Sequence, residues 1–410
     1  MGMNETPSAE RVHIGIFGRR NAGKSSVMNA VTGQSLAIVS DRKGTTTDPV
    51  KKAMELLPLG PVVFVDTPGL DDEGELGRQR VEKSYQALEQ TDLAALVIDG
   101  EGAAEPDALL RVERPLLKEL AARRIPYVIA VNKADALTEQ KKRAWEGLFA
   151  DEKNLLFVSA KSGEHIQDLK ECLAKLRPEE IEKRRILGDL LQPGDVVVLV
   201  VPIDSAAPKG RLILPQQQVI RDCLEVGAHP FVTRETELCA ALSALSKKPK
   251  VVVTDSQAFE RVAKDTPEDM FLTSFSILFS RYKGDLAQQV KGAKALLALR
   301  DGDVLLISEG CTHHRQCEDI GTVKMPRWIR EYTGKDIQFA FTSGTQFPQD
   351  LSQYALIVHC GGCTLNERQM KSRLQCAVER GVPMTNYGMA IAQMHGVLDR
   401  SLALFRAEGG

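Results

Sequence analysis

The stretch GRRNAGKSS at residues 18–26 has the residue types and spacing of a phosphate-binding loop. Glycines in such a loop let backbone amides point at phosphate oxygens, while the lysine reaches the β and γ phosphates and the hydroxyl residue binds Mg²⁺. The pattern G-x-x-x-x-G-K-S/T is filled here by Gly18, Gly23, Lys24 and Ser25. We therefore expect a nucleotide site, lined also by Asn21 and Ser26.

Three further stretches follow in the order that a guanine nucleotide site requires. DTPG (66–69) offers Asp66 to hold magnesium through water and the Gly69 amide to meet the γ-phosphate. NKAD (132–135) supplies the Asp135 carboxylate, which can accept two hydrogen bonds from guanine N1 and N2, a pattern that adenine cannot offer. SAK (159–161) can add a backbone donor to the guanine oxygen. Together they predict GTP as the ligand, with the base held by Asn132, Lys133, Asp135, Ser159, Ala160 and Lys161.

The stretch GTTTDPV (44–50) is similar to switch I of the TrmE and Era group of GTPases, where a threonine senses the γ-phosphate and Mg²⁺. We assign this role to Thr46 rather than to either neighbouring threonine. Leu70 follows the DTPG stretch and cannot orient a water as the glutamine of signalling GTPases does, so hydrolysis is expected to be slow or to need another device. The residues expected to carry catalysis are Lys24, Asp66, Gly69 and Thr46, with Mg²⁺ on Ser25 and Thr46.

Asn21 can supply that device. In TrmE-like GTPases an asparagine at this place in the loop helps to bind K⁺, which adds positive charge in the transition state. The alternative is that Asn21 only stabilises the turn of the loop. On this resemblance we favour the potassium interpretation.

Cysteines and histidines in CTHHRQC (311–317) and HCGGC (359–363) form a second group that can do chemistry. The glycines between Cys360 and Cys363 free the backbone to turn both sulfurs to one side, and Cys311 with His313 can close a metal site. Two cysteines with two histidines suit zinc, whereas three thiolates with a weaker fourth ligand suit a 4Fe-4S cluster, and the ligand types leave both open. His359 is a further possible ligand, and Cys317 is a spare thiol.

Both groups of residues follow predicted strands. Up to about residue 176, short apolar runs alternate with segments of helical length, which predicts an α/β fold with a mostly parallel sheet and helices on both faces. The runs are VHIGIF (12–17), PVVFVD (61–66), DLAALVID (92–99), PYVIAVN (126–132) and NLLFVSA (154–160). Ligands of such sheets lie beyond the carboxyl ends of the strands, where the nucleotide-binding stretches fall.

Two smaller α/β units are expected further along the chain. The charged stretch at 177–195 ends in Pro-Gly and suits a boundary. Predicted strands then lie at 196–204 and 250–256 in the second unit, and at 303–310 and 354–362 in the third, where the two cysteine stretches follow the last two strands. We predict a P-loop GTPase domain over 1–178 and smaller domains over 179–270 and 271–410.

The composition narrows the class of protein. A hydrophobic fraction of 43% and a charged fraction of 26% are those of a soluble globular chain, and a net charge of −2 argues against a dedicated nucleic-acid binder. No apolar run reaches the roughly 18 residues of a membrane span, and the first residues do not form a signal sequence. A cytoplasmic protein without membrane or nucleic-acid contact is expected, whose cysteines are thiols or metal ligands rather than disulfides.

A TrmE-like GTPase domain followed by a small α/β unit, C-x-H and H-C-x-x-C resembles the HydF family of FeFe-hydrogenase maturation GTPases over nearly the whole chain. The resemblance implies a dimerising middle domain and a 4Fe-4S cluster on Cys311, Cys360 and Cys363, with His313 or His359, a carboxylate or solvent as fourth ligand. It implies a scaffold that receives a di-iron precursor made with two radical-SAM maturases and passes it to apo-FeFe-hydrogenase. GTP turnover with Mg²⁺ and K⁺ would then regulate partner exchange in a homodimer or larger homo-oligomer.

Two other functions compete with this hypothesis. A zinc-containing GTPase of ribosome assembly or tRNA modification would use similar motifs, but the slight negative charge and the lack of an obvious Lys/Arg-rich face count against an RNA partner. A metal-binding scaffold with a purely structural nucleotide site is disfavoured, because Lys24, Ser25 and Asp66, which hydrolysis requires, are intact.

Overall fold

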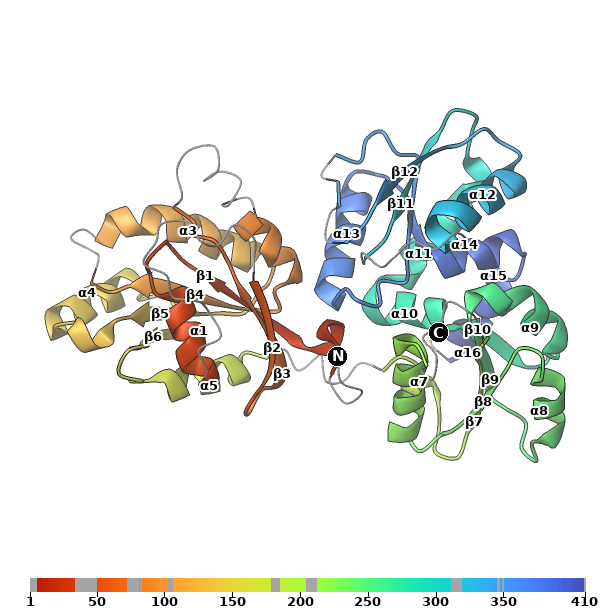
Figure 1. Ribbon diagram of the computed structural model, residues 1–410, viewed down its shortest axis with the longest axis horizontal. Coiled ribbons are helices and arrows are strands. Elements are labelled where there is room, and N and C mark those ends of the chain that lie inside the picture. The colour runs from red at the N-terminus through yellow and green to blue at the C-terminus, as the bar shows by residue number, and fades with distance from the viewer. Residues whose placement is uncertain are drawn as a thin grey trace. The chain divides into compact units, whose positions relative to one another are not determined.

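The computed structural model describes residues 6–33, 50–71, 81, 83–101, 106–177, 185–203, 212–310, 319–344, 347–348 and 350–408. The chain divides into two compact units, Met1–Glu182 and Lys183–Gly410 (Figure 1). Each unit is organised around parallel strands with helices packed on them. None of the helices in the described ranges combines the length and apolar character needed to cross a membrane.

The first unit is built on a six-stranded sheet in the order β2-β3-β1-β4-β5-β6. All neighbours are parallel except β2 with β3, which run antiparallel. The strands are β1 (Val12–Phe17), β2 (Val50–Leu56), β3 (Gly60–Asp66), β4 (Leu93–Asp99), β5 (Tyr127–Asn132) and β6 (Leu155–Phe157). The edge strand β2 was not predicted, because its alternating charged residues lack the continuous apolar run of the inner strands.

Helices cover both faces of this sheet, as the sequence predicts. Side chains of α1 (Lys24–Thr32) and α5 (Ile166–Lys175) join a core on one face, around Val27, Met28 and Leu169. Those of α3 (Pro106–Ala122) and α4 (Glu139–Leu148) join a separate core with Leu116 and Trp145. Because apolar side chains of the inner strands enter both cores, those strands are buried along most of their length.

The second unit contains two four-stranded, wholly parallel sheets, ordered β10-β9-β7-β8 and β12-β11-β13-β14. The strands are β7 (Val196–Val200), β8 (His229–Thr233), β9 (Val251–Thr254), β10 (Phe271–Ser274), β11 (Val304–Ser308), β12 (Gln338–Thr342), β13 (Leu356–His359) and β14 (Met384–Asn386). The helices are α7 (Leu214–Glu225), α8 (Leu238–Ala244), α9 (Phe259–Asp265), α10 (Phe275–Lys283), α11 (Leu286–Ala295), α12 (Met325–Thr333), α13 (Glu367–Glu379), α14 (Tyr387–Met394), α15 (Leu398–Ser401) and α16 (Ala403–Glu408).

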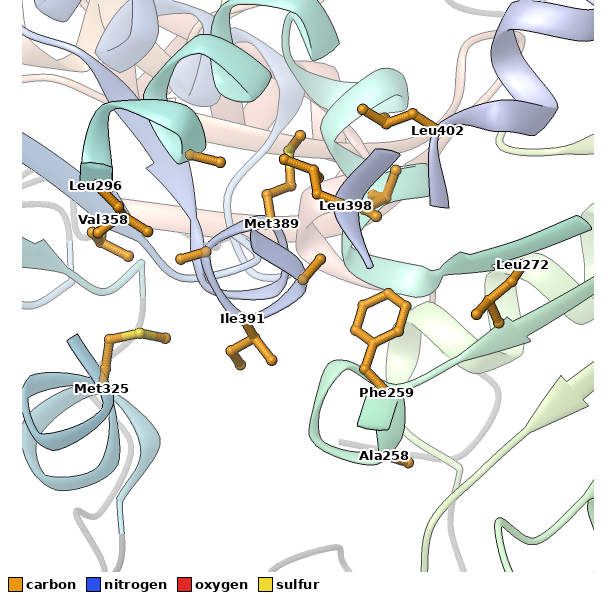
Figure 2. Close-up of a cluster of buried hydrophobic side chains, with 14 of the residues drawn as sticks. Ala258, Phe259, Leu272, Leu296, Met325, Val358, Met389, Ile391, Leu398 and Leu402 are labelled. Atoms are coloured by element: carbon orange, nitrogen blue, oxygen red, sulfur yellow. The ribbon is translucent and has the colours of Figure 1, made fainter. Parts of the chain in front are cut away.

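One hydrophobic core joins the two sheets of the second unit. It contains Val198 from β7 and Leu272 from β10 together with Leu305 from β11 and Val358 from β13. Figure 2 shows Phe259 of α9 and Leu272 of β10 in the same cluster as Ile391 of α14 and Met325 of α12. Burial of this apolar surface stabilises both sheets together, so the second unit packs as one body.

The segment that opens the second unit is fixed by a buried carboxylate. Asp222 of α7 is 7% exposed, and its Oδ2 accepts hydrogen bonds from three successive backbone amides at 3.1, 2.8 and 2.7 Å, those of Ile186, Leu187 and Gly188. Next along the chain, Asp189 accepts a hydrogen bond at 3.0 Å from Arg281 of α10. The chain that enters this unit is therefore tied to α7 and α10.

Candidate nucleotide and metal sites

The phosphate loop of the first unit runs from the end of β1 to the start of α1. Gly23 has φ 88°, and a Cβ atom there would lie 2.2 Å from Nδ2 of Asn132. Only glycine accommodates both the left-handed backbone and this approach, which explains its place in the motif. The loop leads into the N-terminus of α1, and helix N-termini favour bound anions such as phosphate.

Lys24 is the first residue of α1, and its side chain is folded back across the loop. It is 9% exposed, and its Nζ donates to the carbonyl oxygens of Gly18 at 3.0 Å and Arg19 at 2.8 Å. These contacts hold a buried ammonium group inside the phosphate loop. The residue therefore lies where the sequence predicts it, with its charge directed into the loop.

Ser25 and Asp66 meet next to the loop, as a magnesium site requires. Ser25 Oγ donates to Asp66 Oδ2 at 2.8 Å, while Asp66 Oδ1 is buried without a hydrogen-bond partner. Burial raises the pKa of Asp66, since little solvent stabilises its charge. A hard cation with oxygen ligands would satisfy the orphaned oxygen, so these residues fit Mg²⁺. The third expected ligand, Thr46, lies outside the described residues.

The base-binding residues converge at the ends of β5 and β6. Asn132 is buried: its Nδ2 donates to the Ala22 carbonyl at 3.0 Å, and its Oδ1 accepts from the Ala160 amide at 3.1 Å. Asp135 accepts a hydrogen bond from Ser159 Oγ at 2.6 Å, which lowers the pKa of this exposed carboxyl. Asp135 is thus an ionised acceptor held in place by Ser159, as recognition of guanine N1 and N2 demands.

The remaining predicted residues of this site occupy the same loops. Lys133 has φ 63° and pairs with Asp99 at 2.6 Å. Asn21 has φ 61° and an exposed side chain, a backbone conformation that asparagine tolerates better than most residues. A Cβ atom on Gly69 would lie 3.0 Å from the Arg20 amide, which places Gly69 against the loop. Two further predicted residues are Ser26, which is half-buried on α1, and Lys161, which is exposed.

Sequence reasoning missed one contact of the phosphate loop. Arg19 Nε donates to Oε1 of Glu113 at 2.8 Å, and its Nη2 donates to Oε2 at 3.3 Å. Glu113 lies on α3 and is 1% exposed, so this bidentate ion pair anchors the loop to a helix about ninety residues further on. The glutamate has no motif around it, and only the tertiary structure reveals the pair.

The described cysteines of the second site, Cys360 and Cys363, follow β13, which pairs with β11 so that Ser308 lies beside His359. The amide of Gly310 donates to Cys360 Sγ at 3.0 Å, and the amide of Gly362 does so at 3.4 Å. Amide donors stabilise a thiolate, the form of cysteine that binds metals. This surrounding of the sulfur fits a metal–thiolate centre, and Cys363 lies on the same loop.

The other predicted ligands, Cys311 and His313, and the spare thiol Cys317 lie outside the described residues. Gly310, which precedes Cys311 in the sequence, is one of the two residues whose amides contact the Cys360 sulfur. Within the ranges that the structure describes, no group of three or more cysteine, histidine or acidic side chains is arranged to hold a metal ion.

His359 is completely buried, and both of its ring nitrogens are engaged. Arg373 Nη1 donates to Nε2 at 2.8 Å, which requires Nδ1 to carry the proton that it donates to the Cys360 carbonyl at 2.7 Å. Burial and the adjacent guanidinium lower the pKa of His359 to about 3. The ring is neutral and presents no lone pair to a metal in this arrangement.

A buried carboxylate lies next to the same loop. Glu309 follows β11, is 5% exposed and accepts a hydrogen bond from the Tyr387 hydroxyl at 3.2 Å. Burial and the nearby negative charge raise the pKa of Tyr387, so the phenol remains a donor. A Cβ atom on Gly321 would lie 2.5 Å from Glu309 Oε1, so Gly321 packs closely against this pair.

Comparison with known protein families identifies the chain. Residues 287–404 match the hydrogen maturase F tetramerization domain, and residues 186–284 match the hydrogen maturase F dimerization domain. The chain belongs to the hydrogen maturase F family. Residues 13–133 match the 50S ribosome-binding GTPase family, which implies GTP and Mg²⁺ as ligands of the first unit. The predicted resemblance and the α/β P-loop fold are confirmed.

Curated relatives of this hydrogen maturase F member match its GTPase region. The tRNA modification GTPase MnmE of Heliobacterium modesticaldum is 37% identical over 166 residues, 39% of this chain and 33% of that protein. GTPase Der of Wolinella succinogenes is 32% identical over 182 residues, 42% of this chain and 37% of that protein. The chain thus spans about a third of the length of these relatives. A crystal structure of Era from Aquifex aeolicus aligns with a TM-score of 0.36 and 19% identity, covering 62% of this chain and 99% of that one.

Proposed function

We propose that this protein is a GTP-hydrolysing scaffold that binds a 4Fe-4S cluster, accepts a di-iron precursor and delivers it to apo-FeFe-hydrogenase. The observation that carries the proposal is the environment of Cys360, whose sulfur accepts hydrogen bonds from two backbone amides near the ends of adjacent strands. The same chain also has the phosphate loop. Family membership supports the link to hydrogenase maturation. Delivery, rather than cluster chemistry, is the step that GTP turnover would time.

At the nucleotide site, Lys24 would exchange the Gly18 and Arg19 carbonyls for the β and γ phosphates. Mg²⁺, when bound by Ser25 and Thr46 with Asp66 through water, would neutralise phosphate charge. Leu70 is 6% exposed and has no group that orients water, so we expect slow turnover. Potassium held by Asn21 would supply the missing positive charge.

At the second site, Cys311, Cys360 and Cys363 would hold the cluster. The cluster supplies an iron with an exchangeable fourth ligand, to which a cargo can bind and from which it can be released. His359 is engaged by Arg373 and the Cys360 carbonyl, so we propose that it orients the loop, leaving His313, a carboxylate or solvent for the fourth position.

We propose a homodimer or larger homo-oligomer that also binds two radical-SAM maturases. The dimerization and tetramerization domains support self-association. Strand β8 lies at the edge of its sheet, and Phe231 and Val232 on it are 38% and 44% exposed, which makes this edge a candidate interface. We retain the division into domains over 1–178, 179–270 and 271–410, with β10 completing the second sheet across the last boundary.

Anaerobic reconstitution with iron and sulfide tests the proposal. We expect a brown protein with about four irons per chain, loss of this iron in Cys360→Ala, and loss of GTP turnover but not of iron in Lys24→Ala. Metal analysis, absorption spectra and phosphate release measure these outcomes. A colourless protein with one zinc would favour the zinc-GTPase alternative, and turnover retained in Lys24→Ala would contradict the assignment of the nucleotide site.

A further inference from the structure

Two buried cationic side chains hold opposite ends of the Cys360–Cys363 loop. Arg373 of α13 is 2% exposed and contacts His359, directly before Cys360, while its Nη2 donates to the Gly344 carbonyl at 2.8 Å. Lys283, the last residue of α10, is 3% exposed, and its Nζ donates to the Leu365 carbonyl at 3.1 Å. Leu365 comes two residues after Cys363, so the loop is held on both sides by a cation.

The contact made by Lys283 reaches the cysteine site through a short series of close contacts. Leu365 packs on Gly310, where a Cβ atom would lie 2.8 Å from the leucine Cγ, and Thr364 Oγ1 donates to the Gly310 carbonyl at 3.1 Å. The Gly310 amide in turn donates to Cys360 Sγ. Lys283 therefore fixes the part of the loop that closes over the residue contacting the Cys360 sulfur.

Lys283 and the cysteine loop that it contacts belong to different domains of the family. Lys283 lies within residues 186–284, which match the dimerization domain, whereas both cysteines of the loop lie within residues 287–404, which match the tetramerization domain. The Lys283 ammonium also lies 5.7 Å from the centre of the Phe279 ring, a contact that offsets part of the cost of burying its charge. Thiolates that hold an iron–sulfur cluster make the loop anionic, so this buried cation would stabilise the negative charge of the bound cluster.

We propose that Lys283 is a positioning residue of the iron–sulfur site, contributed by the dimerization domain, which holds the cysteine loop and stabilises the reduced cluster by its positive charge. This inference rests on the proposed function, because it needs a cluster on Cys360 and Cys363. A purely structural role makes a different prediction. A lysine in the last turn of α10 also favours the helix dipole, and loss of that contribution would alter stability but not the reduction potential.

The test compares substitutions of Lys283 in the reconstituted full-length protein. Reduction potentials from redox titrations followed by electron paramagnetic resonance, and rates of iron release to a chelator, are the two readouts. For Lys283→Met we expect the reduction equilibrium to shift about tenfold toward the oxidised cluster, ~59 mV to lower potential for one electron, and faster iron release. Lys283→Arg should restore the potential.

Arg281→Met is the matched control, because it removes the same charge from the same helix. Arg281 donates to Asp189 and to the Ile186 carbonyl rather than to the cysteine loop. The reduction potential of the cluster and the rate of iron release in Arg281→Met should therefore stay at the wild-type values. If Lys283→Met does not fold, Lys283→Gln replaces it, since glutamine retains a hydrogen-bond donor but not the charge.

The outcomes separate this inference from the proposed function. A wild-type protein that takes up no cluster overturns the proposed function. A wild-type cluster whose potential is unchanged in Lys283→Met, or in Lys283→Gln, overturns the inference alone. Equal shifts in Lys283→Met and Arg281→Met would also overturn it, because they would show a general effect of α10.

Discussion

The Ser25–Asp66 position of the nucleotide site and the cysteine site occupy equivalent places in their sheets but suit ligands of opposite charge. Both sites lie beyond the carboxyl ends of parallel strands, β1, β3, β5 and β6 in the first unit and β11 and β13 in the second. At the nucleotide site, Asp66 keeps a buried oxygen without a partner, which a cation would satisfy. At the cysteine site, Lys283 and Arg373 bring buried positive charge to the loop, which an anionic cluster would offset.

The two sites also differ in how far apart their ligand-contacting groups lie in the sequence, although the phosphate loop too has a distant anchor, Glu113. The phosphate loop and Lys24 form one continuous motif whose backbone does the binding. Cys360 depends on Gly310, fifty residues earlier, and its loop depends on Lys283, 82 residues before Leu365. Phosphate recognition can be encoded locally because it uses consecutive amides, whereas a thiolate centre needs charges and donors from several elements.

Asp135→Asn gives the largest effect that we expect at the first site alone. An amide cannot accept both guanine N–H groups as the charged carboxylate does, so GTP affinity should fall roughly a hundredfold or more. Titration with a fluorescent GTP analogue measures this loss. The exposed Asp151→Asn should bind GTP normally, and iron content should be unchanged in both variants. Parallel loss of iron would show that the two sites are not independent.

Arg373→Met tests the second site. The substitution removes the donor to His359 Nε2 and to the Gly344 carbonyl and the cation over the Phe347 ring, at 5.2 Å, so we expect the free energy of unfolding to fall by about 2–3 kcal/mol. Urea unfolding followed at Trp328, in a Trp145→Phe background, reports the second unit.

The control for Arg373 is Arg327→Met on α12. Its side chain is 61% exposed, so the same loss of charge should change stability by less than about 0.5 kcal/mol. Equal stability of the Arg373→Met and wild-type proteins would contradict the role that the structure gives this arginine.

Replacing K⁺ by Na⁺ has the smallest expected effect and concerns the first site only. If Asn21 helps to bind potassium, GTP hydrolysis should slow severalfold, because the transition state loses positive charge. Phosphate release at constant ionic strength measures the change, and Asn21→Ala should remove the difference between the two cations. A wild-type rate that is indifferent to the cation would leave Asn21 as a turn residue only.

The sequence predicted the inner strands of the first unit and the motifs at their ends, because buried parallel strands are continuous apolar runs. It did not predict the edge strand β8 or β12, whose residues are largely exposed and lack that pattern. The sequence left open whether His359 is a metal ligand or only a residue next to the site. The choice depends on Arg373, which lies on the polar helix α13 without any motif around it.

By itself the sequence predicted a glycine loop for phosphate, a guanine site at NKAD, and cysteine pairs after two strands. These properties depend on residues close together in the chain, so spacing reveals them. Only the tertiary structure decided which groups surround the cysteine loop and which residue anchors the phosphate loop. Lys283, Arg373 and Glu113 act through contacts between distant elements, and the physical reason is that a buried charge is stabilised by whatever the fold brings next to it.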